Sequence, residues 1–157
     1  MNRPEGMTVF LDRDGTLIKD HGRKHLGDMT KVQILPGVLE GLRLLKWAGA
    51  RLILITNQGF VNRGLISLAG MHLTTGTMER KMARVGVTLE GVFYCPHAPE
   101  ENCPCRKPRV GMGTRARLRC DVRGPVFMVG DKGVDVGFGR GIGARTVGAT
   151  GLWVGHV

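Results

Sequence analysis

Short apolar runs alternate with helical patterns along this chain. Four runs, at residues 8–12, 51–56, 91–94 and 126–130, are rich in β-branched, aromatic and leucine side chains and predict strands. The run at 51–56 is almost entirely apolar, which is typical of a strand covered on both faces. Because helical patterns lie between the runs, the order strand, helix, strand predicts parallel βαβ units.

Two amphipathic helices are predicted between the strands. The first opens at Pro36 and ends at Gly49, and its apolar face consists of Val38, Leu39, Leu42 and Leu45. The second is capped by Ser67 and stopped by Gly86, and its inner face consists of Met71, Met78, Met82 and Val85.

The C-terminal part of the chain is harder to assign. Residues 133–143 fall where the alternation requires a helix, but they include five glycines, each costing on the order of 1 kcal/mol relative to alanine. We therefore expect a short or frayed helix there. One or two last strands are expected over 145–149 and 152–154.

Length and charge restrict the class of protein. A chain of 157 residues suits one domain spanning 1–157, and a formal net charge of +10 favours anionic partners such as phosphorylated metabolites or nucleic acid. No signal-peptide core or bilayer-length apolar run is evident, so we expect a cytoplasmic protein with no membrane partner. Its four cysteines should then be reduced or bound to metal.

Polar side chains follow three of the predicted strands directly. Asp12 and Asp14 end the first strand, with Arg13 between them expected to face away, and Gly15 allows the chain to turn. Thr56-Asn57-Gln58 ends the second strand, and Asp131 ends the fourth. Parallel strands place such residues together at one edge, where hard oxygen ligands suit Mg²⁺. The alternative for Asp-x-Asp-Gly is an ordinary polar turn.

The cysteines and one histidine form two short chelating arms. Cys95 and His97 make the first arm, and Cys103 and Cys105 make the second. Three thiolates and an imidazole at this spacing can close a tetrahedral structural Zn²⁺ site and so fold a polar, proline-broken loop. The alternative is separately buried thiols. Cys120 stands apart and is expected to be an ordinary small buried residue.

The polar segment 18–35 leaves the first strand and has no clear periodicity. A loop of this length that starts at the paired carboxylates is expected to face the substrate. His21 and His25 are four residues apart and could bind a metal, or they could be solvated or contact the substrate.

Asp12-Arg13-Asp14-Gly15-Thr16 resembles the first motif of the haloacid-dehalogenase-like phosphatases. Cys-Pro-His at 95–97 and Cys-Pro-Cys-Arg-Lys-Pro at 103–108 resemble the zinc-containing branch of that family, which comprises heptose-1,7-bisphosphate and histidinol-phosphate phosphatases. The likeness runs from about Met7 onward. It implies an α/β, doubly wound, Rossmann-like parallel sheet without a large cap domain and with a zinc-stabilised loop.

The resemblance also implies a mechanism. Asp12 would attack phosphorus to form an aspartyl-phosphate, and Asp14 would protonate the leaving oxygen and later deprotonate water. Mg²⁺ would be held by Asp12, by Asp131 and by the main-chain oxygen of Asp14, with Asp135 supporting it from behind.

Further side chains are implied to bind the substrate. The transferring phosphate would be clamped by Thr56, Asn57 and Lys107. Arg106 and Lys132 would contact the remaining phosphate or hydroxyls of a sugar. Lys132 and the Arg63-Gly64 pair favour the heptose enzymes over the histidinol-phosphate enzymes, although the loop Asn-Gln-Gly-Phe-Val-Asn-Arg-Gly departs from the heptose pattern.

The resemblance thus implies a phosphatase that removes the 7-phosphate of heptose 1,7-bisphosphate, with histidinol phosphate as the alternative substrate, and we expect a monomer. A different class, a basic zinc-containing nucleic-acid-binding protein, is suggested by seven cations against one acid between Arg106 and Arg123. Aromatic residues make up only 5% of the chain, which leaves few platforms for base stacking.

Overall fold

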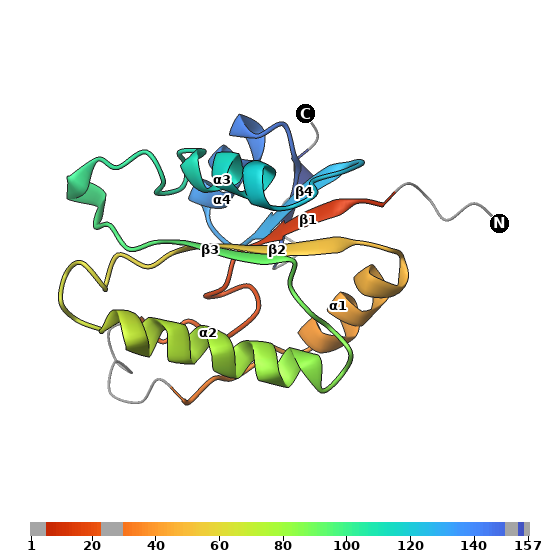
Figure 1. The fold of residues 1–157 in the computed structure, drawn as a ribbon, viewed down its shortest axis with the longest axis horizontal. Helices are drawn as coiled ribbons and strands as arrows, with labels where there is room; N and C mark the ends of the chain where they lie inside the picture. The colour runs from red at the N-terminus through yellow and green to blue at the C-terminus, as the bar shows by residue number, and fades with distance from the viewer. Residues whose placement is uncertain (1–5, 23–29, 150–153, 156–157) are drawn as a thin grey trace.

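The structure, a computed structural model, describes residues 6–22, 30–149 and 154–155. Six strands form one sheet in the order β3-β2-β1-β4-β5-β6 (Figure 1). The strands are β1 (Thr8–Leu11), β2 (Arg51–Asn57), β3 (Gly91–Cys95), β4 (Val126–Gly130), β5 (Arg145–Gly148) and β6 (Val154–Gly155). The first five are parallel, and β6 is antiparallel to β5. Leu152 and Trp153, expected in the last strand, lie outside the described residues.

Helices cover both faces of this sheet. Figure 1 shows α1 (Val38–Trp47) and α2 (Leu68–Ala83) on one face, and α3 (Gly111–Arg119) and α4 (Gly133–Gly141) on the other. Successive strand residues alternate between two cores: Val9 and Leu11 pack with α1 and α2, whereas Phe10 packs with α3 and α4. The predicted doubly wound sheet is confirmed. Within the described ranges, no helix is long and apolar enough to span a membrane.

The helices under the first face follow the sequence pattern with one correction. The Ser67 hydroxyl accepts a hydrogen bond from the Gly70 amide at 2.9 Å, and Met71, Met78 and Met82 are buried as expected. However, α1 begins at Val38 and not at Pro36, because Gly37 has a left-handed backbone with φ of 78°. That conformation cannot lie inside an α-helix, so Pro36 belongs to the preceding turn.

The glycine-rich segment forms the short helix α4, which has nine residues, in agreement with the expected short helix. A Cβ atom on Gly139 would lie 2.4 Å from Thr146 Cγ2, and one on Gly137 would lie 2.7 Å from Pro108 Cβ. These glycines therefore allow α4 to approach β5 and the loop after β3 closely. Glycine lowers the helix propensity of this segment, but larger residues at these two positions would prevent α4 from packing here.

Gly139→Ala is expected to lower the free energy of unfolding by about 1–3 kcal/mol, because the added methyl overpacks a buried contact. Gly41→Ala is the matched control: it lies within α1, and its Cβ would meet nothing within 4 Å. That change should raise stability by about 0.5–1 kcal/mol through helix propensity alone. Urea unfolding midpoints measure both, and equal effects of the two changes would contradict the packing argument.

Candidate active site and metal centres

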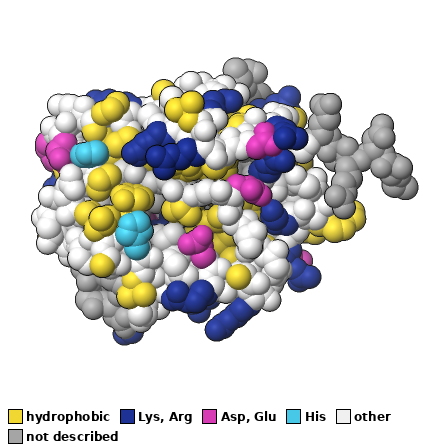
Figure 2. All heavy atoms as spheres, in the orientation of Figure 1, with side chains coloured by type: hydrophobic (Ala, Val, Ile, Leu, Met, Phe, Trp, Pro, Cys, Tyr) yellow, Lys and Arg dark blue, Asp and Glu magenta, His cyan; other side chains and the backbone are white. Residues whose placement is uncertain are grey.

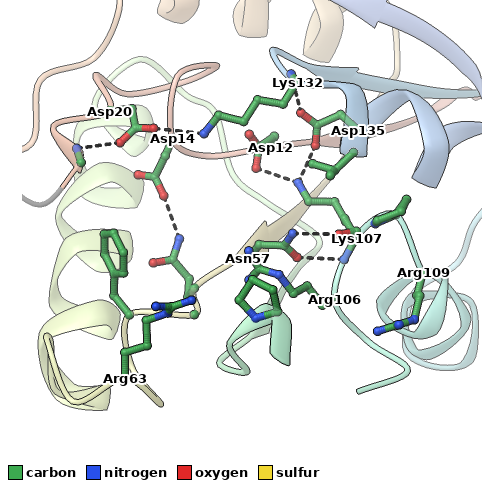
Figure 3. A pocket seen from close by; sticks show the side chains of 17 residues that line it. Asp12, Asp14, Asp20, Asn57, Arg63, Arg106, Lys107, Arg109, Lys132 and Asp135 are labelled. Atoms are coloured by element: carbon green, nitrogen blue, oxygen red, sulfur yellow. Dashed lines mark hydrogen bonds and ion pairs between the residues drawn. The ribbon is translucent and has the colours of Figure 1, made fainter. Parts of the chain in front are cut away.

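A cavity of about 720 Å³ opens at the carboxyl ends of the central strands. Its lining comes from the loops that follow β1, β2, β3 and β4, so residues far apart in the chain meet there (Figure 3). The cavity is lined by the carboxylates of Asp12, Asp14, Asp20 and Asp135 and by the cations of Arg63, Arg106, Lys107, Arg109 and Lys132. This is the strand edge at which the sequence places its candidate residues.

Three carboxylates gather beside β1. Oxygens of Asp12, Asp131 and Asp135 all lie within 4.8 Å of one another. Asp131 Oδ1 is buried and has no hydrogen-bond partner among the described residues, which is costly for a carboxylate unless a cation binds it. A Cβ atom on Gly15, whose φ is 80°, would lie 2.2 Å from Asp131 Oδ2, so the glycine leaves space for that side chain. These donors fit Mg²⁺.

Lys107 neutralises part of this negative charge. Its ammonium, on a residue only 2% exposed, donates to Asp12 Oδ1 at 2.8 Å, to Asp135 Oδ1 at 2.6 Å and to the Ile55 carbonyl at 2.9 Å. Burial raises the pKa of Asp12 to about 7, and the Lys107 ammonium acts in the opposite direction. The other oxygen of Asp135 accepts the amides of Asp131 and Lys132, so Asp135 fixes the loop after β4.

Asn57 lines the cavity, and its side chain also contacts the backbone of Lys107. Its Oδ1 accepts the Lys107 amide at 2.9 Å, and its Nδ2 donates to the Lys107 carbonyl at 3.1 Å. Both polar atoms of the side chain therefore hold the backbone of the lysine. Thr56 is 1% exposed, is not among the residues that line the cavity, and accepts a hydrogen bond from Gln58 Nε2 at 2.8 Å.

The expectation that Arg13 faces away from the paired carboxylates is wrong. Its guanidinium donates to both carboxylate oxygens of Asp14, at 3.1 and 3.0 Å, and Gln58 Nε2 donates to Asp14 Oδ2 at 2.8 Å. Strand alternation does not apply here because β1 ends at Leu11 and the chain turns at once. Gln58 was not singled out from the sequence, although it belongs to the polar cluster that ends the second strand.

The loop after β1 reaches the cavity as expected. Asp20 and Gly22 line it, and Asp20 Oδ2 pairs with Lys132 Nζ at 3.1 Å (Figure 3). Although burial disfavours the charged form of Lys132, the contact with Asp20 raises the pKa of its ammonium. No sequence signal distinguishes Asp20 from its polar neighbours. His25, considered above with His21 as a metal pair, lies outside the described residues.

The second candidate metal centre begins at the end of β3. Donor atoms of Cys95, His97, Cys103 and Cys105 lie within 4.8 Å of one another, with Cys95 Sγ and Cys105 Sγ 3.1 Å apart. Although burial opposes ionisation, hydrogen bonds from Cys95 and from the Arg106 amide lower the pKa of Cys103 to about 7. Three sulfurs and one imidazole that converge in this way fit Zn²⁺ with no open position.

The candidate zinc-binding loop, residues 95–109, also shapes the cavity rim. Arg106 Nη1 donates to the His97 carbonyl at 3.1 Å, and Arg109 Nη1 donates to the Cys103 carbonyl at 2.8 Å. Arg63, from the loop after β2, pairs at 2.7 Å with Glu100 in the short 3-10 turn η2 (Pro99–Glu101). Arg109 was not among the expected site residues. The loop thus directs cations toward the cavity.

A parallel sheet whose strand ends carry this carboxylate and lysine arrangement defines a phosphatase of the haloacid-dehalogenase-like class. Comparison with known families agrees, since residues 7–134 match the polynucleotide kinase 3 phosphatase family. The chain belongs to that family.

Named relatives cover most of the chain. The chain is 40% identical over 140 residues to D-glycero-beta-D-manno-heptose-1,7-bisphosphate 7-phosphatase of Pasteurella multocida, covering 85% of this chain and 75% of the relative. The Haemophilus influenzae protein of the same name is 40% identical over 145 residues, which are 87% of this chain and 76% of that one. A crystal structure of D,D-heptose 1,7-bisphosphate phosphatase from B. bronchiseptica, complexed with magnesium and phosphate, has a TM-score of 0.80 and 31% identity, and covers 89% of this chain and 78% of that one.

Proposed function

We propose that this protein is a magnesium-dependent phosphomonoesterase that removes the 7-phosphate of D-glycero-D-manno-heptose 1,7-bisphosphate. The single observation that carries the substrate is 40% identity to phosphatases of that name over most of both chains. The cluster of three carboxylates beside Lys107 supports phosphate-ester hydrolysis, since it offers a nucleophile and a metal site within one cavity.

In this proposal, a carboxylate oxygen of Asp12 attacks phosphorus and the bond to the leaving oxygen breaks. Asp14 gives that oxygen a proton and then takes one from the water that hydrolyses the aspartyl-phosphate. Asp12, Asp131 and the main-chain oxygen of Asp14 would hold Mg²⁺, which supplies positive charge against the phosphoryl oxygens. Asp135 orients the metal-binding residues through its hydrogen bonds with Lys107 and with the amides of Asp131 and Lys132.

The phosphate is bound by groups that β2 and the zinc-binding loop present. Lys107 offsets its charge, and Asn57 contributes by fixing the lysine backbone. The phosphate contact of the Thr56 hydroxyl is assigned by the motif resemblance alone, since this side chain is buried and does not line the cavity. The two chelating arms would hold Zn²⁺ and thereby stabilise the loop that carries Arg106 and Lys107.

A bisphosphate carries a second phosphate that does not react, and this phosphate needs cations of its own. Arg106 and Lys132 line the same cavity as Asp12, and we assign the second phosphate to them. Histidinol phosphate has one phosphate only, so it leaves these cations without an anionic partner.

Magnesium-dependent phosphate release from heptose 1,7-bisphosphate, heptose 7-phosphate and histidinol phosphate tests this proposal at equal concentrations. We expect the bisphosphate to react with the highest kcat/KM, and Arg106→Gln to reduce its advantage over the monophosphate by about tenfold or more. Arg119→Gln, an exposed arginine on α3 outside the cavity, is the matched control. Preference for histidinol phosphate would contradict the proposed substrate but would be consistent with the proposed aspartyl-phosphate mechanism.

A polynucleotide 3′-phosphate is the second candidate substrate. The matching family is described as polynucleotide kinase 3 phosphatase, and Arg115, Arg117 and Arg119 are exposed on α3. Figure 2 shows a compact group of Lys and Arg side chains in the upper part of the face, on the side of the sheet where α3 lies. Faster phosphate release from a 3′-phosphorylated oligonucleotide than from the sugar bisphosphate would favour this candidate.

A further inference from the structure

Arg13 is a buried cation that the proposed mechanism does not use. Its side chain is 6% exposed, yet every nitrogen of its guanidinium has a partner. Nε and Nη2 donate to the two oxygens of Asp14, Nη2 also donates to Gln58 Oε1 at 2.9 Å, and Nη1 donates to Thr75 Oγ1 at 3.1 Å. Burying a guanidinium is costly unless its donors are satisfied in this way.

Thr75 anchors this network to a helix. The buried face of α2 consists of Met71, Thr75, Met78 and Met82, so one hydroxyl interrupts a methionine stripe. Thr75 is 4% exposed, and its oxygen accepts from Arg13. The guanidinium is therefore hydrogen-bonded to α2, a sixteen-residue helix that packs on the sheet.

Gln58 completes the network from the other side. Its amide nitrogen donates to Asp14 Oδ2 and to Thr56 Oγ1, and its amide oxygen accepts from Arg13. In Figure 3 the carboxylate of Asp14 points toward the loop after β2 and not toward Asp12 and Lys107. Three hydrogen bonds from two side chains thus fix both the plane and the direction of the Asp14 carboxylate.

We propose that Arg13 and Gln58 are positioning residues that set the direction from which Asp14 meets the leaving oxygen and the hydrolytic water. The inference rests on the proposed function, in which Asp14 moves the protons. General acid catalysis requires hydrogen-bond reach to the reacting oxygen, and a displacement of about 1 Å can cost about 10²-fold in rate.

The leaving group separates this role from a purely structural one. When Asp12 attacks an alkyl phosphate, the departing alkoxide takes the electron pair of the broken bond and needs a proton from Asp14. p-Nitrophenolate leaves as a stable anion without that proton. A variant with a displaced Asp14 should therefore lose the first step for alkyl phosphates and keep it for p-nitrophenyl phosphate.

The experiment compares Arg13→Met and Gln58→Glu with the unchanged protein by rapid-mixing kinetics. We expect phosphate release from a sugar phosphate to fall by about 10²-fold. The initial burst of p-nitrophenolate should keep its rate, followed by slow turnover because Asp14 also serves the water step. Asp14→Asn is the benchmark and should show the same division between the two substrates with larger losses.

Thr75→Val provides an independent test if Arg13→Met does not fold. It removes the anchor of Arg13 and leaves Asp14 and its other contacts in place, so a smaller loss confined to the alkyl phosphate is expected. Equal losses on both substrates in the Gln58 and Thr75 variants, with the division still present in Asp14→Asn, would overturn the inference alone. If Asp14→Asn shows no such division, the acid–base role in the proposed function fails as well.

Discussion

Replacing Asp12 with asparagine is expected to abolish magnesium-dependent phosphate release, with kcat lowered by about 10⁴-fold or more. An amide cannot attack phosphorus, and the change also removes one carboxylate from the group with Asp131 and Asp135. Lys107 would keep Asp135 as its charged partner, so the fold should persist. Phosphate release and acid-quench trapping of a phosphorylated protein measure the effect.

Asp121→Asn is the matched control for that experiment. Asp121 is exposed and pairs with Arg51 and Arg123 away from the cavity, and exposed pairs contribute about 0–1 kcal/mol. The control should therefore retain full activity. Persistence of a trapped phosphoenzyme in Asp12→Asn, or activity within tenfold of the unchanged protein, would exclude Asp12 as the nucleophile.

Removal of zinc is expected to disorder the loop from Cys95 to Arg109 and to eliminate activity. Structural zinc sites contribute on the order of 10–16 kcal/mol of apparent binding free energy, which for such loops is folding free energy. The loop carries Lys107, whose ammonium lies 2.8 Å from Asp12 Oδ1, so its disorder would remove the cation from the site. Cys103→Ser should reproduce the effect of a chelator.

Zinc content per chain, limited proteolysis and the melting temperature measure this effect. We expect about one zinc per chain, lost together with protease resistance between Cys95 and Arg109. Cys120→Ser is the matched control, since this cysteine lies outside the four-ligand group and is only partly buried, contrary to the burial expected from the sequence. A zinc-free protein that still resists proteolysis in the loop would contradict the structural role of the metal.

Structural features that follow from local sequence patterns were predictable. Strand β2 follows from its apolar run, and the start of α2 follows from Ser67, whose side chain bonds three residues onward. The chelating residues Cys95 and Cys105 are ten positions apart, so their spacing alone indicates a common metal. Carboxylates at strand ends meet because parallel strands share an edge.

Individual side-chain contacts between distant segments were not predictable. Helix propensity disfavours Gly139, and only the position of Thr146 shows why a glycine fits. Strand alternation directs Arg13 away from Asp14, but the chain leaves the strand before that residue. The contact of Lys132 with Asp20 joins residues 112 positions apart, and no local pattern specifies such a pair.

The origin of the site in four adjacent strands also has a consequence for folding. The lysine beside Asp12 is 95 residues further along the chain, and Asp131 and Asp135 follow β4, which pairs with β1. Bringing such segments together costs loop-closure entropy that local contacts cannot offset. The cluster of three carboxylates therefore forms only when the centre of the sheet has assembled. During synthesis, the chain can become catalytically competent only after β4 has been made and has paired with β1.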